Sequence, residues 1–133
     1  MSMSLKMFCY VNGLDEAVAF YQKVFDAEIG ENAKNPDGTY EWCEIGLGNG
    51  ESFYLAEREG EWAVEGAANT GNIKQACLRY KKKDLAKLEK AYERLIEGAN
   101  ILYPLSPAEP LTPATSDLID KYGLRWCLMV WGE

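Results

Sequence analysis

Hydrophobic and polar residues change their spacing near residue 12, and this change divides the start of the chain into two predicted elements. Residues 6–11 follow a two-residue period, with Met7, Cys9 and Val11 on one face and Lys6, Phe8 and Tyr10 on the other. This period predicts a strand with two usable faces. The apolar residues then adopt the helical period, at Leu14, Ala17, Val18, Tyr21, Val24 and Phe25. This stripe predicts a helix lying on a sheet, joined to the strand by a tight corner at Asn12-Gly13.

The same pattern returns near the middle of the chain. Residues 75–80 alternate, with Ala76, Leu78 and Tyr80 against Gln75, Cys77 and Arg79. A second helical stripe follows at Leu85, Leu88, Ala91, Tyr92, Leu95 and Ile96. Asp15 lies beside the start of the first predicted helix, and Asp84 is a candidate N-cap of the second. Each helix leads into a strand-like stretch, residues 27–30 and 100–103, so the chain contains two weakly similar copies of one β-α-β unit.

The rest of the first half adds two predicted strands. Residues 35–38 have turn chemistry and precede a strand in which Cys43, Ile45 and Leu47 alternate with Trp42, Glu44 and Gly46. A short connection at residues 48–50 leads into a strand over residues 52–56, and the first module therefore reads β-α-β-β-β. Residues 57–71 are polar and acidic, and they read as a linker or as a lid. Trp62 in this segment is an interface anchor or part of the lid, and we favour the anchor.

The second half departs from this pattern after residue 103. Prolines recur at every third position from Pro104 to Pro113, a spacing that suits an extended path and removes backbone donors from a central strand. We therefore expect an edge strand or a loop here. Order returns at residues 116–120, a turn follows at residues 121–123, and residues 124–131 form the last strand. Its two faces carry Arg125, Cys127, Met129 and Trp131 against Trp126, Leu128 and Val130.

Composition limits the class of protein. The 133 residues, 47% of them hydrophobic, suit one globular domain or two small modules with a shared core. The formal charge of −7 makes nucleic acid and anionic membrane surfaces poor partners. The basic run at residues 81–83 reads as a solvated turn. The four cysteines include no C-x-x-C pair, and we interpret them as free thiols in a reducing, cytoplasmic compartment, since the sequence shows no signal peptide or membrane span.

Two stretches of the chain resemble a known family. The run YVNGLDEAVAFYQKVFDAEIG and the ending SDLIDKYGLRWCLMV are similar to the vicinal oxygen chelate superfamily, which includes glyoxalases, bleomycin resistance proteins and extradiol dioxygenases, and within it to the PhnB-like branch. The resemblance implies an α+β fold of two βαβββ modules, whose curled mixed sheet surrounds a cup with the helices on the convex face. It also implies a homodimer. Asp26 stands where the family often has Gly, and Asp tolerates the left-handed cap that this turn requires.

The domain organisation expected from the repeats and the resemblance is a single domain over residues 1–133. Module one covers about residues 1–57, a linker covers about residues 58–72, and module two covers about residues 73–133.

The resemblance also implies positions for a divalent metal, which the superfamily holds with His, Glu or Gln residues. Carried over one at a time, these positions fall at Lys6, near Tyr54, at Cys77 or alternatively Gln75, and at Cys127. A lysine ammonium is no metal ligand, and the chain contains no histidine. Zinc held by the two cysteines is a minor alternative. We therefore expect no metal and no cofactor.

Strand parity predicts which residues line the cup. If the helices cover the faces that carry Val11, Leu55, Leu78 and Leu128, the opposite faces are open. These faces carry Lys6, Phe8, Tyr10, Trp42, Glu44, Ser52, Tyr54, Gln75, Cys77, Arg79, Arg125, Cys127 and Met129. Aromatic walls with a few charges are typical of a small-molecule pocket, although the aromatic residues also suit a filled core.

Glu44 has two interpretations. It pairs with Lys6, Arg79 or Arg125 in a structural role, or burial raises its pKa and it acts as a general base while a basic residue holds an anionic substrate. Cys77 and Cys127 read as packing residues.

Three functional hypotheses follow. The first is a metal-free binding protein for an aromatic or anionic small molecule, and we favour it because no nucleophile has an activating partner. The second is a metal-independent isomerase or lyase with Glu44 as the base. The third is an interaction module whose cup is filled by its own side chains.

Overall fold

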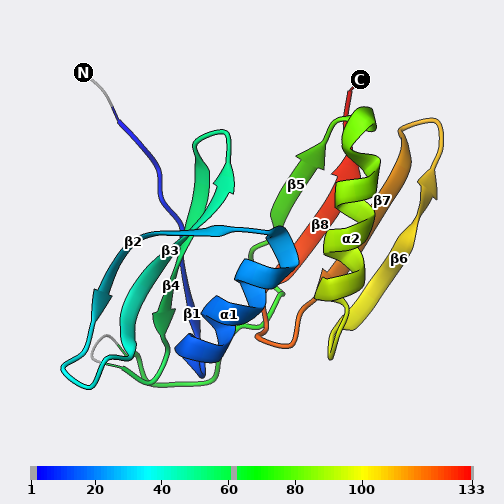
Figure 1. Ribbon diagram of the computed structural model, residues 1–133. Coiled ribbons are helices and arrows are strands. Elements are labelled where there is room, and N and C mark those ends of the chain that lie inside the picture. The colour runs from blue at the N-terminus through cyan, green and yellow to red at the C-terminus, as the bar shows by residue number, and fades with distance from the viewer. Residues whose placement is uncertain (1–2, 61–62, 133) are drawn as a thin grey trace. The chain divides into compact units, whose positions relative to one another are not determined.

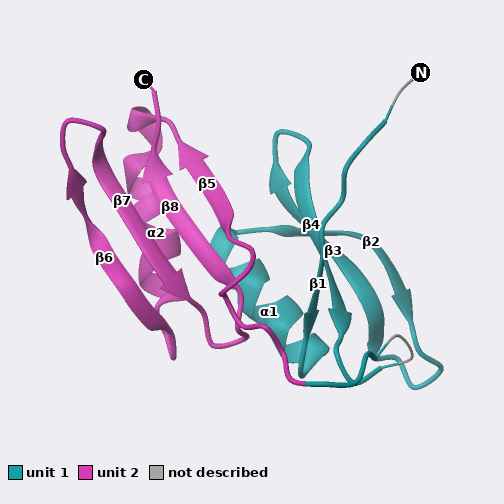
Figure 2. Cartoon of the chain, turned by 180° about the vertical axis from the view of Figure 1, so that it is seen from behind, with its two compact units in different colours: residues 1–66 teal, residues 67–133 magenta. Residues whose placement is uncertain are grey.

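The computed structural model describes residues 3–60 and 63–132. The chain divides into two compact units, residues 1–66 and residues 67–133 (Figure 2). The boundary between them falls inside the segment that the sequence indicated as a linker. Trp62, the predicted interface anchor, lies outside the described residues. Each unit is described below by itself.

Unit 1 has the element order predicted from its sequence. It consists of β1 (Phe8–Val11), α1 (Leu14–Phe25), β2 (Glu28–Lys34), β3 (Tyr40–Gly48) and β4 (Glu51–Glu57) (Figure 1). The four strands form one sheet in the order β1-β4-β3-β2. The β1 and β4 strands are parallel, whereas β3 is antiparallel to both of its neighbours. The sheet is therefore mixed, as the fold class requires.

The core of unit 1 lies between α1 and one face of this sheet. The predicted helical stripe is confirmed, because Leu14, Ala17, Val18, Tyr21 and Val24 are all buried. The helix packs against β3 and β4, and the Phe53 ring meets the rings of Tyr21 and Phe25 edge to face. Burial of each such large side chain contributes about 1.5–3 kcal/mol to the stability of the fold. The opposite face of the sheet carries no helix (Figure 1).

The two ends of α1 are closed in different ways. Gly13 at the N-cap has a φ of 77° and no side chain that could cap the helix. The Glu57 carboxylate of β4 instead accepts hydrogen bonds from the backbone N–H groups of Gly13 at 3.1 Å and Leu14 at 3.2 Å. At the other end Asp26 has a φ of 50°, which confirms the predicted left-handed cap.

Unit 2 repeats the architecture of unit 1. It consists of β5 (Ala76–Tyr80), a short 3-10 helix η1 (Lys82–Asp84), α2 (Leu85–Leu95), β6 (Asn100–Ala108), β7 (Thr112–Ile119) and β8 (Arg125–Val130). Its strand order is β5-β8-β7-β6, with β5 parallel to β8 and the other pairs antiparallel. Leu88, Ala91 and Leu95 form the buried stripe of α2. The two βαβββ units confirm the predicted fold class.

Several boundaries and contacts differ from the sequence-based predictions. The second strand extends to Lys34 rather than ending at residue 30. Pro104 and Pro107 lie within the edge strand β6 and Pro110 lies in the turn that follows it, so the prediction of an edge or loop is confirmed for these three. It is wrong for Pro113, which lies near the start of the interior strand β7. Asp84 occupies the N-cap position of α2, as predicted, but its side chain makes no capping hydrogen bond and instead lies 4.0 Å from Lys87 Nζ. Met7 is 44% exposed rather than buried, because α1 packs mainly on β3 and β4 and leaves the start of the edge strand β1 uncovered.

None of the helices in the described part of the chain has the length and apolar character needed to span a bilayer.

Candidate functional site

Three aromatic rings gather on the open face of the unit 1 sheet. Phe8 from β1 stacks on Tyr54 from β4, with the ring centroids 4.7 Å apart. The Trp42 ring from β3 lies 5.9 Å from Tyr54 and 6.5 Å from Phe8. We call these three residues the aromatic cluster. Tyr54 is only 6% exposed, whereas Phe8 is 46% exposed, so the cluster presents one ring to solvent above a buried one.

The strand register explains why these residues meet. Phe8 is the direct partner of Tyr54, and Tyr54 is the direct partner of Glu44, so the three form one row across β1, β4 and β3. Residues in one row point to the same face of a sheet. Trp42 lies two residues from Glu44 on β3 and therefore shares that face. The prediction that these residues lie on one face of the sheet, made from their alternation along each strand, is confirmed.

A hydrogen-bonded network borders the aromatic cluster. The Tyr54 hydroxyl donates to Glu31 Oε1 at 2.8 Å, and this bond together with burial raises the pKa of Tyr54 to about 12. The Ser52 hydroxyl donates to Glu44 Oε2 at 2.7 Å, and the Lys6 ammonium lies 3.4 Å from Ser52 Oγ. The network places acidic, basic and neutral polar groups beside the rings.

The environment of Glu44 differs from the one predicted. The backbone N–H of Glu31 donates to Glu44 Oε1 at 3.0 Å, and this bond, with the one from Ser52, lowers the pKa of Glu44 below its usual value. The rise in the pKa of Glu44 that accompanied the general-base interpretation is therefore wrong. Because hydrogen bonds to the charged form outweigh desolvation here, Glu44 is held as a carboxylate.

Glu31 takes part in this network although the sequence did not point to it. The pairing of β2 with β3 shifts between Ile29 and Asn32, so that Gly30 and Glu31 together lie opposite Glu44. Such a bulge re-aims the side chains around it. The glycine at position 30 was the available sequence signal, because a Cβ there would overlap the Glu44 carboxylate.

The open face of unit 2 contains a second polar group, centred on Asp117. Arg125 from β8 forms a two-pronged ion pair with the Asp117 carboxylate, in which Nε lies 2.9 Å from Oδ1. The Gln75 amide donates to the same Oδ1 at 2.9 Å. The bonds from Arg125 lower the pKa of Asp117. Asp117 was absent from the predicted site, although its register with Cys127 could have placed it on this face.

The remaining predicted residues of unit 2 lie on β5 and β8. Cys77 is the direct partner of Cys127, and Arg79 is the direct partner of Met129. The Arg79 guanidinium lies 4.6 Å from the centroid of the Trp131 ring. Met129 is buried, whereas Cys77 is exposed and Cys127 is half-buried. The pairing of Glu44 with Arg79 or Arg125, one of the interpretations from the sequence, joins residues of different units and stays a prediction.

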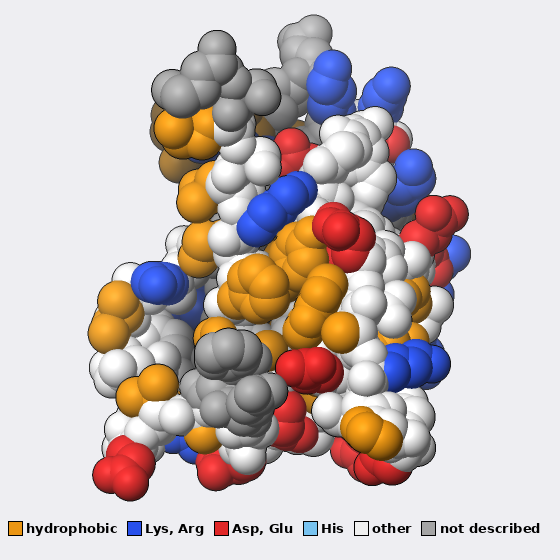
Figure 3. Space-filling view, turned by 90° about the vertical axis from the view of Figure 1, so that its left-hand side faces the viewer, with side chains coloured by type: hydrophobic (Ala, Val, Ile, Leu, Met, Phe, Trp, Pro, Cys, Tyr) orange, Lys and Arg blue, Asp and Glu red, His pale blue; other side chains and the backbone are white. Residues whose placement is uncertain are grey.

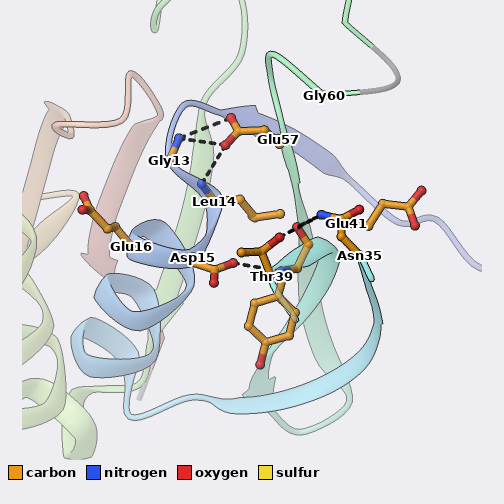
Figure 4. A pocket seen from close by; sticks show the side chains of 10 residues that line it. Gly13, Leu14, Asp15, Glu16, Asn35, Thr39, Glu41, Glu57 and Gly60 are labelled. Carbon is orange, nitrogen blue, oxygen red and sulfur yellow. Dashed lines mark hydrogen bonds between the residues drawn. The ribbon is translucent and has the colours of Figure 1, made fainter. Parts of the chain in front are cut away.

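A separate hollow of about 400 Å³ lies beside the start of α1 (Figure 4). It is lined by Gly13, Leu14, Asp15, Glu16, Asn35, Thr39, Tyr40, Glu41, Glu57 and Gly60. Two of its four acidic residues have partners in the fold, since Glu57 accepts from the N–H groups of Gly13 and Leu14 and Asp15 Oδ1 accepts from the Tyr40 N–H at 2.9 Å. These contacts give the hollow a structural role at the start of the helix.

Side chains at the positions implied for metal ligands do not fit a divalent ion. Lys6 is cationic, and the raised pKa of Tyr54 keeps its phenol protonated near neutral pH. Burial raises the pKa of the Cys127 thiol, and the Gln75 amide donates to Asp117. Over residues 3–60 and 63–132, no three His, Cys, Asp or Glu side chains lie close enough together to hold a metal ion. Metal-dependent chemistry has no fitting ligand set at these positions.

Hydrophobic side chains also gather on the face shown in Figure 3, with basic and acidic side chains beside them.

Comparison with known proteins gives matches in structure only. No family model and no curated protein matches the sequence. A PhnB protein from Bacillus cereus is 21% identical with a TM-score of 0.76, and the match covers 97% of this chain and 100% of that one. A glyoxylase/bleomycin resistance protein/dioxygenase domain from Frankia sp. EAN1pec is 18% identical with a TM-score of 0.68 and 98% coverage of each chain.

A fosfomycin resistance protein, FosX, from Listeria monocytogenes is 14% identical with a TM-score of 0.66, and the match covers 97% of this chain and 93% of that one. At these identities the matches establish the fold. They confirm, at the level of the fold, the resemblance inferred from the two sequence stretches. The chain therefore has the fold of these solved structures, built from two βαβββ units.

Proposed function

We propose that this protein binds a small molecule without a metal, and that the ligand lies on the open face of the unit 1 sheet. The observation that carries the proposal is the stacked pair of Phe8 and Tyr54, in which the outer ring is 46% exposed and the inner ring is buried. The Phe8 ring is fixed on one side by the Tyr54 ring, so its exposed side can stack with an aromatic ring of a ligand.

The polar groups around the aromatic cluster define the ligand further. Lys6 is exposed and lies next to Ser52, so its ammonium is available to an anionic group of the ligand. Glu31 on β2 and Glu44 on β3 repel a second anionic group placed beside them. We therefore propose a ligand that combines an aromatic ring with one anionic group, oriented with that group toward Lys6.

Names of the structural neighbours are consistent with this class of function. One neighbour is a fosfomycin resistance protein and another includes bleomycin resistance in its name. We infer binding of a small molecule here by analogy of fold, which carries no information about the identity of the ligand. A homodimer and a cytoplasmic location stay predictions from the sequence.

The alternative function, a metal-independent isomerase or lyase with Glu44 as the general base, is less well supported. A base near neutral pH benefits from a raised pKa, and the hydrogen bonds from the Glu31 N–H and Ser52 lower that of Glu44. Both Glu44 oxygens also already accept hydrogen bonds. These contacts suit a carboxylate that positions its neighbours.

The proposal can be tested by a thermal-shift screen with aromatic carboxylates and phosphonates, run with EDTA and again with Mn²⁺, Ni²⁺ or Zn²⁺. We expect ligands that stabilise the protein equally in both conditions. Phe8→Ala should abolish the shift. Tyr103→Ala is the matched control, because Tyr103 is similarly exposed at 42% on β6 of unit 2.

Two results would overturn the proposal. One is a stabilising ligand whose effect requires the metal, and the other is equal loss of binding in the Phe8 and Tyr103 variants. Glu44→Gln separates binding from catalysis. The enzyme hypothesis is the correct one if the protein converts a stabilising ligand to a product, and if Glu44→Gln binds that ligand normally but does not convert it.

A further inference from the structure

Two cysteine thiols lie side by side on the open face of the unit 2 sheet. Cys77 on β5 and Cys127 on β8 are direct partners in the parallel register of these strands. Paired residues on neighbouring strands have their Cα atoms about 4.8 Å apart and point to the same face. Disulfides form between Cα atoms about 4.4–6.8 Å apart. The backbone therefore already holds the two residues at a spacing that a disulfide accepts.

The two thiols differ in their surroundings. Cys77 is exposed, whereas Cys127 is half-buried and its Sγ lies 3.7 Å from the Thr115 hydroxyl. Burial and the neighbouring Cys77 raise the pKa of the Cys127 thiol, although the contact with Thr115 opposes the shift. An oxidant in solution therefore reacts with Cys77 first, and Cys127 remains a thiol next to it.

The other two cysteines provide a comparison within the same chain. Cys9 on β1 and Cys43 on β3 are both direct partners of Leu55 on β4, one from each side. They are thus separated by two strand spacings, about 9.6 Å between Cα atoms. That distance exceeds the limit of about 7 Å for a disulfide. Cys43 is also fully buried, and burial raises its pKa to about 11.

We propose that Cys77 and Cys127 form a redox-active dithiol that a hydroperoxide oxidises to a disulfide. The Cys77 thiolate attacks one peroxide oxygen, the O–O bond breaks, and the leaving oxygen departs as water or an alcohol after taking up a proton. The Cys127 thiol then attacks the sulfenic sulfur of Cys77, the S–O bond breaks, and the hydroxyl leaves as water with the thiol proton. Two thiols are oxidised and one peroxide is reduced. This inference depends on unit 2 alone and is independent of the proposed ligand site.

The experiment oxidises the whole chain with hydrogen peroxide under native conditions, blocks the remaining thiols with N-ethylmaleimide in denaturant, and digests it with trypsin without reductant. Cleavage after Lys74, Arg79 and Arg125 releases Cys77 in peptide 75–79 and Cys127 in peptide 126–133. We expect these two peptides to be joined and to separate on reduction. We also expect the oxidised protein to migrate as a monomer on a non-reducing gel.

Variants distinguish this pair from general thiol oxidation. The double variant Cys9→Ser with Cys43→Ala should form the linked peptides to the same extent as the parent. Cys127→Ser should leave Cys77 as a sulfenic acid that dimedone labels, and Cys77→Ser should leave Cys127 unmodified. If the double variant fails to fold, maleimide labelling of Cys9 and Cys43 in the oxidised parent gives the same comparison. Any of three results would overturn the proposal. They are oxidation of Cys77 to a sulfonic acid without a disulfide to Cys127, a disulfide to Cys9 or Cys43, and a disulfide between two copies of the chain.

Discussion

The Glu44 carboxylate fills the space that a side chain at Gly30 would need. We predict that Gly30→Ala forces this carboxylate away and breaks its hydrogen bonds from the Glu31 N–H and Ser52. The expected loss is about 1–3 kcal/mol in the free energy of unfolding, measured by urea denaturation.

The matched control is the same substitution in a Glu44→Ala background. Without the carboxylate to displace, Gly30→Ala should be close to neutral, because a glycine inside a strand is itself slightly destabilising. The two substitutions should therefore be strongly non-additive. An equal loss in both backgrounds would show that the space above Gly30 is not what restricts this position.

This relationship also marks the limit of what the sequence could predict. The alternation in β3 and β4 placed Trp42, Glu44 and Tyr54 on one face, since a strand of ordinary period leaves no other choice. The bulge at Gly30 and Glu31 breaks that period on β2. Gly30 is a local signal compatible with a bulge, but the register that places Glu31 beside Glu44 depends on the pairing with β3. The predicted second strand accordingly ended at residue 30, and Glu31 was missed.

Contacts between residues distant in the chain were missed for the same reason. The periodicity of α1 and α2 predicted their buried stripes correctly, because that pattern lies within each helix. The capping group of α1 comes from Glu57, which is 44 positions away on β4. Asp15, which lies beside the start of α1 in the sequence, does not cap the helix, and its carboxylate accepts from the Tyr40 N–H.

Glu57 gives the second prediction. Glu57→Ala removes the acceptor of the Gly13 and Leu14 N–H groups and the negative charge at the start of α1. We expect a loss of about 1–2 kcal/mol in the free energy of unfolding. Glu57→Gln keeps an oxygen acceptor and should lose less. Glu59→Ala is the control, since that side chain is 70% exposed and pairs only with Arg58 nearby, and a comparable loss there would contradict the capping role.

The third prediction concerns the pH dependence of stability in unit 2. The folded state lowers the pKa of Asp117 below 3.8, chiefly through Arg125, so the ionised form is favoured by folding. The resulting stability is present above about pH 4 and is lost as the pH falls through the lowered value. Asp117→Asn should therefore cost about 1–2 kcal/mol at pH 7. The difference from the parent should shrink below pH 4 in urea unfolding series.

Glu97→Gln provides the comparison for this pH series. Glu97 pairs with Lys121 on the surface, where its side chain is 72% exposed, so its removal should change stability by less than about 0.5 kcal/mol. A pH-independent gap between the parent and Asp117→Asn would mean that the substitution acts through packing and not through charge.

The last prediction uses the hydrogen bond from Tyr54 to Glu31. This bond raises the pKa of Tyr54 to about 12, and burial does the same for Tyr80. Because the folded state favours the protonated phenol, the stabilisation is complete below about pH 10 and is lost as the pH rises toward 12. A titration of phenolate absorbance, with circular dichroism confirming that the chain stays folded, should show late-titrating tyrosines that include Tyr54 and Tyr80. Tyr54→Phe should reduce the number of late-titrating tyrosines by one. Glu31→Gln should move one of them to lower pH and leave Tyr80 in place. An unchanged late-titrating group in both variants would mean that the Tyr54 hydroxyl does not bond to Glu31 in solution, and the polar border of the aromatic cluster would then need a different description.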